Sequence, residues 1–152
     1  MGTDVPMTAI GNTALLDEPL LGLVASRQCS GHVLLQTLEL AAQWAREQQV
    51  VLSGFHSPLE QQVLRSMLRR HGRVIKVLAR GLGEPAKDDR AALATGQMLI
   101  ITACPPTVKR TTRATALARN RLVLALSDEQ CLLVTQPSSV GVDGKRTADR
   151  MP

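Results

Sequence analysis

Two short loops carry residue types that bind phosphate. The first contains Ser26 and Arg27, which directly follow the apolar run 20–25, and Ser30-Gly31 comes shortly afterwards. Hydroxyls, backbone amides and a guanidinium at the start of a helix can form an anion site, because the first N–H groups of a helix are free and carry partial positive charge. An ordinary strand-to-helix turn with an exposed arginine explains the same residues equally well.

The second loop is Ser53-Gly54-Phe55-His56, between another apolar run and a predicted helix. Gly54 allows close approach of a ligand or of another backbone. Phe55 could stack on a nucleobase or fill the core. His56 has no serine or cysteine nucleophile with an orienting carboxylate nearby, so we interpret it as a loop residue that can contact a ligand, not as a catalytic base.

Basic residues also gather around the last predicted helix. Arg119-Asn120-Arg121 lies inside it, and Lys109, Arg110 and Arg113 come before or at its start. Arg121 falls on a stripe that we predict to face the core, formed with Ala114, Leu117, Ala118 and Ala125. A guanidinium in that position needs a carboxylate or a bound anion as its partner. A solvated basic loop is the alternative for Lys109 and its neighbours.

Two further motifs do not support cofactor binding. The segment 81–86 matches G-x-G-x-x-A, but it follows the third predicted strand and contains Glu84, whose charge opposes a pyrophosphate. Gly144-Lys145 resembles the end of a P-loop, yet Ser139 stands where that motif needs glycine. We therefore expect no cofactor.

Composition limits the classes of protein that fit. The chain has 152 residues, 44% of them hydrophobic, and a net charge of +5, so it is long enough for one domain and its basic balance suits a phosphate-bearing partner. No apolar run is long enough to span a membrane and no secretory signal begins the chain, so we expect a cytoplasmic protein without a membrane partner. The three cysteines are widely spaced and predict neither zinc nor disulfides.

The elements that would position these residues alternate between strands and helices. Strands are predicted at 20–25, 50–52, 74–78, 98–101 and 131–134, and helices at 32–49, 57–70, 88–94 and 113–126. Ser57, Pro58 and Glu60 form a capping box, which explains Glu60 without a role as general base. This order predicts an α/β, Rossmann-like three-layer fold with a mainly parallel sheet of about five strands and helices on both faces. We expect an N-terminal segment at 1–19, the domain at 20–135 and a disordered tail at 136–152.

Taken together, these segments resemble the DNA-processing protein A (DprA/Smf) family of the SLOG Rossmann-like superfamily. Ala25-Ser26-Arg27 resembles the family's "GSR" turn, the segment 53–68 aligns with "SGLARGIDAAAHRGAL", and the segment 119–128 aligns with "RNRIIAGLSD". The chain departs from the family where Gly-Ile-Asp becomes Pro58-Leu59-Glu60 and where the histidine becomes Leu64. The family's final "SGSLxTA" turn is missing or reduced.

The resemblance implies a DNA-binding protein, not an enzyme. Family members bind single-stranded DNA through phosphate contacts at the carboxyl edge of the sheet, load recombinase and form dimers, so recombinase and a second copy of the chain are implied protein partners. The DNA-binding candidates that follow from the matched loops are Ser26, Arg27, Ser53, Gly54, Phe55, His56, Lys109, Arg119 and Arg121.

Two other functions remain open at the level of sequence. A SLOG-type sensor or enzyme for a small nucleotide would use the same kind of pocket, although the "PGGxGTxxE" segment of the related phosphoribohydrolases is absent from the chain. A degenerate scaffold with an empty pocket is the other alternative, because the family's Asp and His equivalents have been replaced.

Overall fold

The computed structural model describes residues 6–26 and 30–133. In chain order the elements are β1 (Thr8–Gly11), the 3-10 helix η1 (Thr13–Asp17), β2 (Leu20–Ala25), α1 (Gly31–Arg46), β3 (Val50–Ser53), α2 (Pro58–Arg69), β4 (Arg73–Leu78), α3 (Lys87–Ala94), β5 (Met98–Thr102), α4 (Arg113–Leu126) and β6 (Glu129–Leu133). The predicted alternation of strands and helices from residue 20 onward is confirmed.

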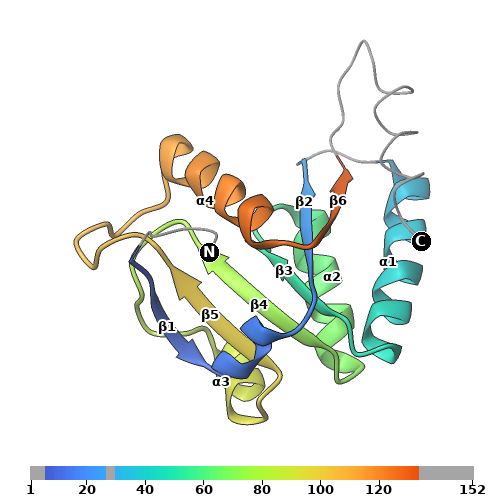
Figure 1. Ribbon diagram of the computed structural model, residues 1–152. Helices are drawn as coiled ribbons and strands as arrows, with labels where there is room; N and C mark the ends of the chain where they lie inside the picture. The colour runs from blue at the N-terminus through green and yellow to red at the C-terminus, as the bar shows by residue number, and fades with distance from the viewer. Residues whose placement is uncertain (1–5, 27–29, 134–152) are drawn as a thin grey trace.

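The strands form one sheet in the order β1-β5-β4-β3-β2-β6 (Figure 1). Strands β2 to β6 pair in parallel, and β1 pairs antiparallel with β5 at one end of the sheet. The chain therefore moves outward from β2 to β5 and then returns along α4 to place β6 on the other side of β2. In such a sheet ligands bind beyond the carboxyl ends of the strands, where the connections diverge.

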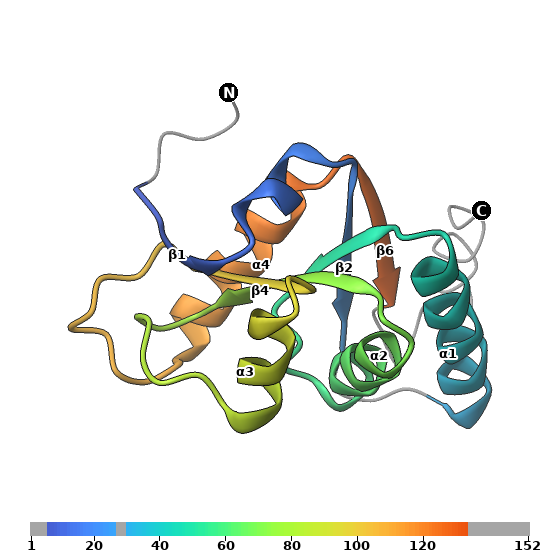
Figure 2. The same cartoon turned by 90° about the horizontal axis from the view of Figure 1, so that it is seen from below.

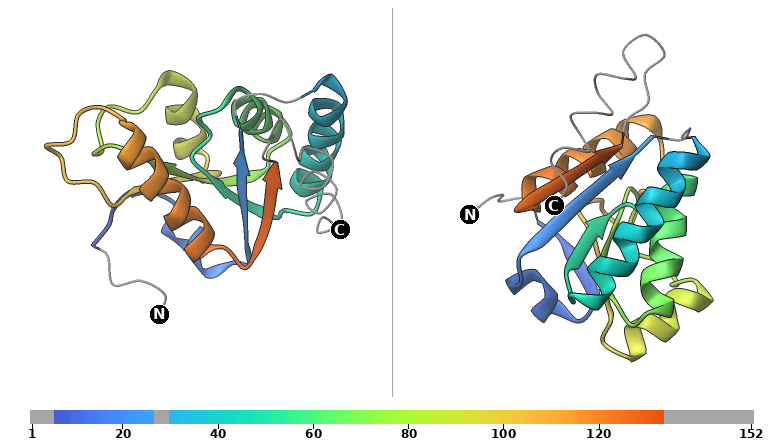
Figure 3. Two further views of the ribbon diagram at one scale, coloured as in Figure 1. Left: turned by 90° about the horizontal axis from the view of Figure 1, so that it is seen from above. Right: turned by 90° about the vertical axis from the view of Figure 1, so that its right-hand side faces the viewer.

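Helices cover both faces of the sheet. Helices α1, α2 and α3 lie on one face, and α4 and η1 lie on the other (Figures 2 and 3). Side chains along each strand alternate between the two layers: in β5, Met98 and Ile100 pack with the first group of helices, whereas Leu99 and Ile101 pack with α4 and η1. This confirms the three-layer, Rossmann-like architecture predicted from the sequence.

Caps fix the starts of the helices that reach the carboxyl edge. At α2, Ser57 Oγ accepts from the Glu60 amide at 3.3 Å, and the Glu60 carboxylate accepts in return from the Ser57 amide at 3.2 Å. At α4, Thr112 Oγ1 accepts from the Thr115 amide at 3.1 Å. The predicted capping box at Ser57 is confirmed, and α4 begins at the predicted residue, 113. Local sequence therefore determines where these two helices begin.

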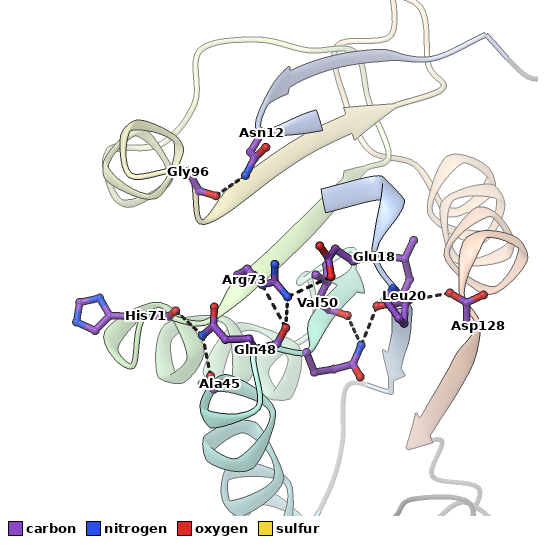
Figure 4. Close-up of polar contacts among 12 residues, drawn as sticks. Asn12, Glu18, Leu20, Ala45, Gln48, Val50, His71, Arg73, Gly96 and Asp128 are labelled. Carbon is purple, nitrogen blue, oxygen red and sulfur yellow. Dashed lines mark hydrogen bonds and ion pairs between the residues drawn. The ribbon is translucent and has the colours of Figure 1, made fainter. Parts of the chain in front are cut away.

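Polar contacts hold the opposite, amino edge of the sheet together (Figure 4). The Leu20 amide donates to Asp128 Oδ2 at 2.8 Å, which ties the start of β2 to the turn before β6. Arg73 donates to the Gln48 carbonyl and lies 3.5 Å from Glu18. These contacts tie the starts of neighbouring strands together.

Two sequence predictions need correction. The sequence predicts no strand in the segment 1–19, yet β1 forms there and adds a sixth strand to the sheet, because its four backbone positions pair with β5. The predicted core-facing stripe of α4 is wrong as well: Ala114, Leu117, Ala118, Arg121 and Ala125 are exposed, Leu117 by 52%. The face that packs on the sheet is instead the one that carries Arg119 and Val123.

Candidate functional site

A pocket of about 540 Å³ opens at the carboxyl edge of the sheet. Three segments far apart in the sequence line it: the end of β2, the loop from β3 into α2, and the first half of α4. Its lining residues are Ala25, Ser26, His56, Ser57, Glu60, Thr111, Thr112, Arg113, Ala116, Arg119 and Asn120. The starts of α2 and α4 both meet here, and we refer to this cavity as the edge pocket.

Arg119 is the central cation of the edge pocket. It lies one helical turn before Val123 on the buried face of α4, at the point where the sheet beneath the helix ends. Gly54 makes room for it, since a Cβ added at Gly54 would lie 2.6 Å from Arg119 Nε and closer still to Cζ and Nη1. The glycine after β3 is therefore required by the arginine that lies over it.

The described residues use only part of the hydrogen-bonding capacity of the guanidinium. Within the described residues its hydrogen bond runs from Nε to Asn120 Oδ1 at 2.8 Å. In that same part of the chain no fully buried polar side-chain atom lacks a partner, so the terminal nitrogens of Arg119 reach the surface of the pocket. Arg119 thus has donors for the two-point recognition of a phosphate.

Burial shapes the electrostatics of this arginine. Arg119 is only 7% exposed, and the loss of solvent lowers its pKa from the ordinary value, while the nearby Glu60 carboxylate acts in the opposite direction. A guanidinium remains charged at neutral pH even so. A desolvated charge gains more from an anionic ligand than an exposed one does, because the effective dielectric constant around it is low.

Glu60 is the acidic residue of the pocket, and its oxygens are engaged by backbone. Oε1 accepts from the amides of His56 at 2.8 Å and Ser57 at 3.2 Å, and Oε2 accepts from the Ala25 amide at 2.8 Å. The predicted capping role is confirmed, and the link to β2 is an addition that local sequence could not show. The carboxylate fills the amide cluster at the start of α2, so a ligand anion must bind outside it, toward Arg119 and α4.

The start of α4 supplies the outer wall. Thr112 and Arg113 are exposed and both line the pocket. Arg113 is the first residue of α4, where the partial positive charge of the helix end adds to its own. The edge pocket therefore has two arginines for an anion, one buried and one exposed.

The structure brings several of the predicted site residues together. Ser26 and His56 line the edge pocket with Arg119, and Gly54 lies directly beneath the Arg119 guanidinium. Ser53 is fully buried, and its Oγ accepts from the Phe55 amide at 3.1 Å, so its role is to hold the loop.

Phe55 belongs to the core. Its side chain is 3% exposed and packs with the cluster under α1 and α2, so stacking on a base is not available to it in this conformation. Its backbone has φ of 48°, a left-handed value that is uncommon for a bulky residue. The local strain turns the chain from β3 toward the start of α2.

Two more of the predicted residues lie exposed outside the edge pocket. Lys109 lies exposed in the loop before α4, and Arg121 lies on the exposed outer side of α4, so the reason given for Arg121, a core-facing position, is wrong. Arg27 lies outside the described residues, as does the predicted tail 136–152.

Sequence reasoning pointed to Arg113 at the start of α4 but not to the polar residues beside it. Thr111, Thr112 and Asn120 line the edge pocket without having been singled out as binding residues. The Thr112 cap was readable from the sequence, but its proximity to the loop after β3 depends on how α4 crosses the sheet. Among the described residues no cluster of three His, Cys, Asp or Glu could hold a metal ion, and no helix is long and apolar enough to cross a membrane.

The topology and the pocket define the class of this protein: a Rossmann-like α/β domain with an arginine-lined pocket at the carboxyl edge of its sheet. Residues 4–142 match the family model for DNA recombination-mediator protein A, and the chain belongs to that family. The family resemblance predicted from the sequence is thereby confirmed. No curated protein matches the sequence.

Two solved structures share the fold. DNA processing protein A (DprA) from Streptococcus pneumoniae superposes with a TM-score of 0.69 at 22% identity, over 95% of this chain and 52% of the pneumococcal one. DNA processing protein A from Helicobacter pylori, described for its single-stranded DNA binding mode, gives 0.67 at 23% identity, over 93% of this chain and 66% of the other. The chain therefore spans between about half and two thirds of the length of these proteins.

Proposed function

We propose that this protein binds single-stranded DNA through its phosphates, in DNA processing, recombination or uptake, without catalysing a reaction. The observation that carries the proposal is the buried Arg119, whose terminal nitrogens open into a pocket beside the exposed Arg113 and the start of α4. Backbone phosphates are the common feature of all single strands, so a site of this kind would bind with little sequence preference.

The comparisons add support from a different direction. The family includes a Helicobacter pylori protein whose single-stranded DNA binding mode has been described, and this chain shares the fold of that protein. The basic sequence, with a pI near 9.7, favours attraction to a polyanion over the whole surface. Arg27 and Lys109 remain predicted DNA contacts, as do the partners implied by the family, recombinase and a second copy of the chain. A cytoplasmic location also remains an expectation.

Fluorescence anisotropy of a labelled dT oligonucleotide tests the proposal with two matched variants. Arg113→Ala removes an exposed charge from the edge pocket, and Arg121→Ala removes an exposed charge from the outer side of the same helix. We expect Arg113→Ala to weaken binding roughly five- to tenfold at low salt and to lower the salt slope by about 0.7. We expect Arg121→Ala to have a much smaller effect.

Two results would contradict the assignment. Equal weakening by both variants would mean that general surface charge, and not the edge pocket, holds the strand. Absence of salt-dependent binding by the unmodified protein would remove the function itself. Circular dichroism of each variant serves as the folding control, since both side chains are exposed and neither replacement disturbs the core.

A small nucleotide is the second candidate ligand. The edge pocket, at about 540 Å³, falls within the range typical of small-molecule sites. Competition by nucleoside monophosphates separates the two candidates. Full displacement of the oligonucleotide at equal phosphate concentration would favour the small nucleotide, because a single strand makes several phosphate contacts that one mononucleotide cannot replace.

A further inference from the structure

A second pocket, of about 340 Å³, adjoins the edge pocket on the other side of Arg119. Its lining residues come from the carboxyl ends of β4 and β5, from α4 and from the loop that precedes α4. Figure 1 shows the course of this loop and of α4. Its walls are mostly apolar, with Leu78, Pro105, Val108, Ala118 and Leu122 among them. We call it the apolar pocket.

The walls of the apolar pocket are held in place by hydrogen bonds. Thr102 Oγ1 donates to the Arg80 carbonyl at 2.6 Å, and the Cys104 amide donates back to the same hydroxyl at 3.0 Å. The Gly81 amide donates to the Val108 carbonyl at 2.8 Å. A Cβ at Gly81 would lie 2.6 Å from the Pro105 carbonyl oxygen, so this glycine serves the contact between two loops and not a dinucleotide. The pocket is therefore a formed cavity.

Arg119 is the residue that the two pockets share. On one side it faces a polar space with Arg113 and the start of α4, and on the other it faces an apolar space. A nucleotide has the same division, with an anionic phosphate next to a flat and largely apolar base. A guanidinium can hydrogen-bond the phosphate and lie against the base, which combines charge pairing with cation–π contact.

We propose that the apolar pocket binds a nucleobase of the strand whose phosphates lie in the edge pocket. The inference rests on the proposed function and extends it from the phosphates to the bases. Phe55 and Trp44 are both buried, so the described part of the chain exposes no phenyl or indole ring for stacking. Base contact in the apolar pocket would come from aliphatic side chains and from Arg119. Apolar contact of this kind fits any base and is consistent with weak sequence preference.

Abasic DNA separates base contact from phosphate contact. A dT oligonucleotide and an oligonucleotide of the same length with abasic sites along its centre carry the same backbone charge. We expect the dT strand to bind roughly tenfold more tightly. Equal affinity of the two strands would overturn the base pocket and leave the phosphate site standing, whereas failure of both strands to bind would remove the proposed function and this inference with it.

A pair of variants on α4 locates the effect. Ala118→Phe places a large side chain at the wall of the apolar pocket, and Ala114→Phe places the same side chain on the same helix at a position that lines neither pocket. Both alanines are exposed, so both variants should fold. We expect the difference between dT and abasic strands to fall to less than about threefold in Ala118→Phe and to persist in Ala114→Phe. If the difference between the two strands persists in both variants, the base does not bind in the apolar pocket.

Cys104 provides a second readout without a change in the protein. It is a partly exposed free thiol in the wall of the apolar pocket, whereas Cys131 is buried. We expect bound dT to slow alkylation of Cys104 by iodoacetamide at least about fivefold, measured on the Cys104 peptide by mass spectrometry, and an abasic strand at equal occupancy to slow it much less. Equal protection by both strands would contradict base occupancy of this pocket.

Discussion

At the scale of single residues, the site depends on one glycine and one arginine that lie on different elements. Gly54 follows β3 and Arg119 lies in the middle of α4, 65 positions later by their numbers, yet a side chain at the first would overlap the guanidinium of the second. The three nearest atoms all belong to the far end of that flexible side chain. A substitution at Gly54 should therefore affect ligand binding more than stability.

Gly54→Ala tests this dependence. We expect the added methyl group to displace the Arg119 guanidinium and to weaken oligonucleotide binding roughly tenfold, with a loss of stability of about 1 kcal/mol or less. Gly83→Ala is the matched control, because the nearest atom to a Cβ there lies at an ordinary 3.5 Å and Gly83 lines neither the edge pocket nor the apolar pocket. Anisotropy gives the affinity and thermal unfolding gives the stability. A large fall in melting temperature with unchanged affinity would contradict the assigned role of Gly54.

Glu60→Gln should lower the stability of the protein and at the same time tighten oligonucleotide binding. The variant replaces a buried carboxylate that accepts from three backbone amides, so we expect a loss of about 2 kcal/mol in the free energy of unfolding. It also removes a negative charge beside Arg119, and we expect the oligonucleotide to bind roughly two- to fivefold more tightly. Glu39→Gln, an equal charge change at an exposed position of α1, is the control. Weaker binding by folded Glu60→Gln would mean that the carboxylate orients the ligand.

At the scale of elements, β1 is the strand that the sequence did not reveal. It is four residues long, all four are exposed, and it pairs along one side only. A short edge strand has neither the continuous apolar run of a central parallel strand nor a clear alternation. Its place depends on the antiparallel partner β5, which no local pattern within residues 1–19 encodes.

Gly11→Ala tests how firmly β1 closes the sheet. Gly11 has φ of 116°, and an added Cβ would lie 2.5 Å from the Met98 carbonyl oxygen, so both the conformation and the space favour glycine. We expect a loss of about 2 kcal/mol in the free energy of unfolding, measured by urea denaturation. Gly83→Ala, where the nearest atom lies at an ordinary 3.5 Å, should change stability by less than about 0.5 kcal/mol. A neutral Gly11→Ala would show that β1 adds little to the stability of the sheet.

The starts of the helices could be predicted from the sequence, but the helix face that packs on the sheet could not. The capping boxes at Ser57 and Thr112 involve residues three apart, so local sequence contains the whole signal. The face that α4 turns toward the sheet cannot be predicted from local sequence. Ala114, Leu117 and Ala118 are small or apolar, yet they face solvent, while the charged Arg119 faces inward because Gly54 leaves space beneath it. That space is a tertiary feature, so the local sequence predicts the wrong face of α4 to be the buried one.

At the scale of the whole molecule, the site results from how the chain crosses its own sheet. Helix α4 leaves β5 near one end of the sheet and reaches β6 beyond β2, so it passes over the loop after β3 (Figure 1). The matched segments around residues 53–68 and 119–128 predicted this meeting through the family resemblance. Hydrophobic periodicity alone could not predict it, because periodicity contains no information on which loops meet.

Because the chain returns along α4, β6 pairs with β2 at the edge of the sheet. The titration of Cys131 in β6 shows whether this strand stays paired until the whole protein unfolds. Cys131 is fully buried in β6 opposite Leu23 of β2, and burial raises the pKa of its thiol to about 12. An unfolded cysteine has a pKa of about 8.5. The thiol is neutral in both states below pH 8.5, so its packing contributes fully there. Above that pH the unfolded state releases the proton first, and stability falls by up to about 1.4 kcal/mol per pH unit until the folded pKa is reached.

Cys131→Ala removes this titration. We expect the free energy of unfolding of the unmodified protein, minus that of the variant, to be nearly constant between pH 6 and 8 and to fall by roughly 2.7 kcal/mol by pH 10.5. Urea denaturation under reducing conditions measures both proteins, and groups that titrate in both cancel in the difference. A difference that stays flat across this range would mean that water reaches Cys131 while the rest of the protein remains folded. In that case β6 would separate from β2 before global unfolding, and the sheet would not unfold as one cooperative unit.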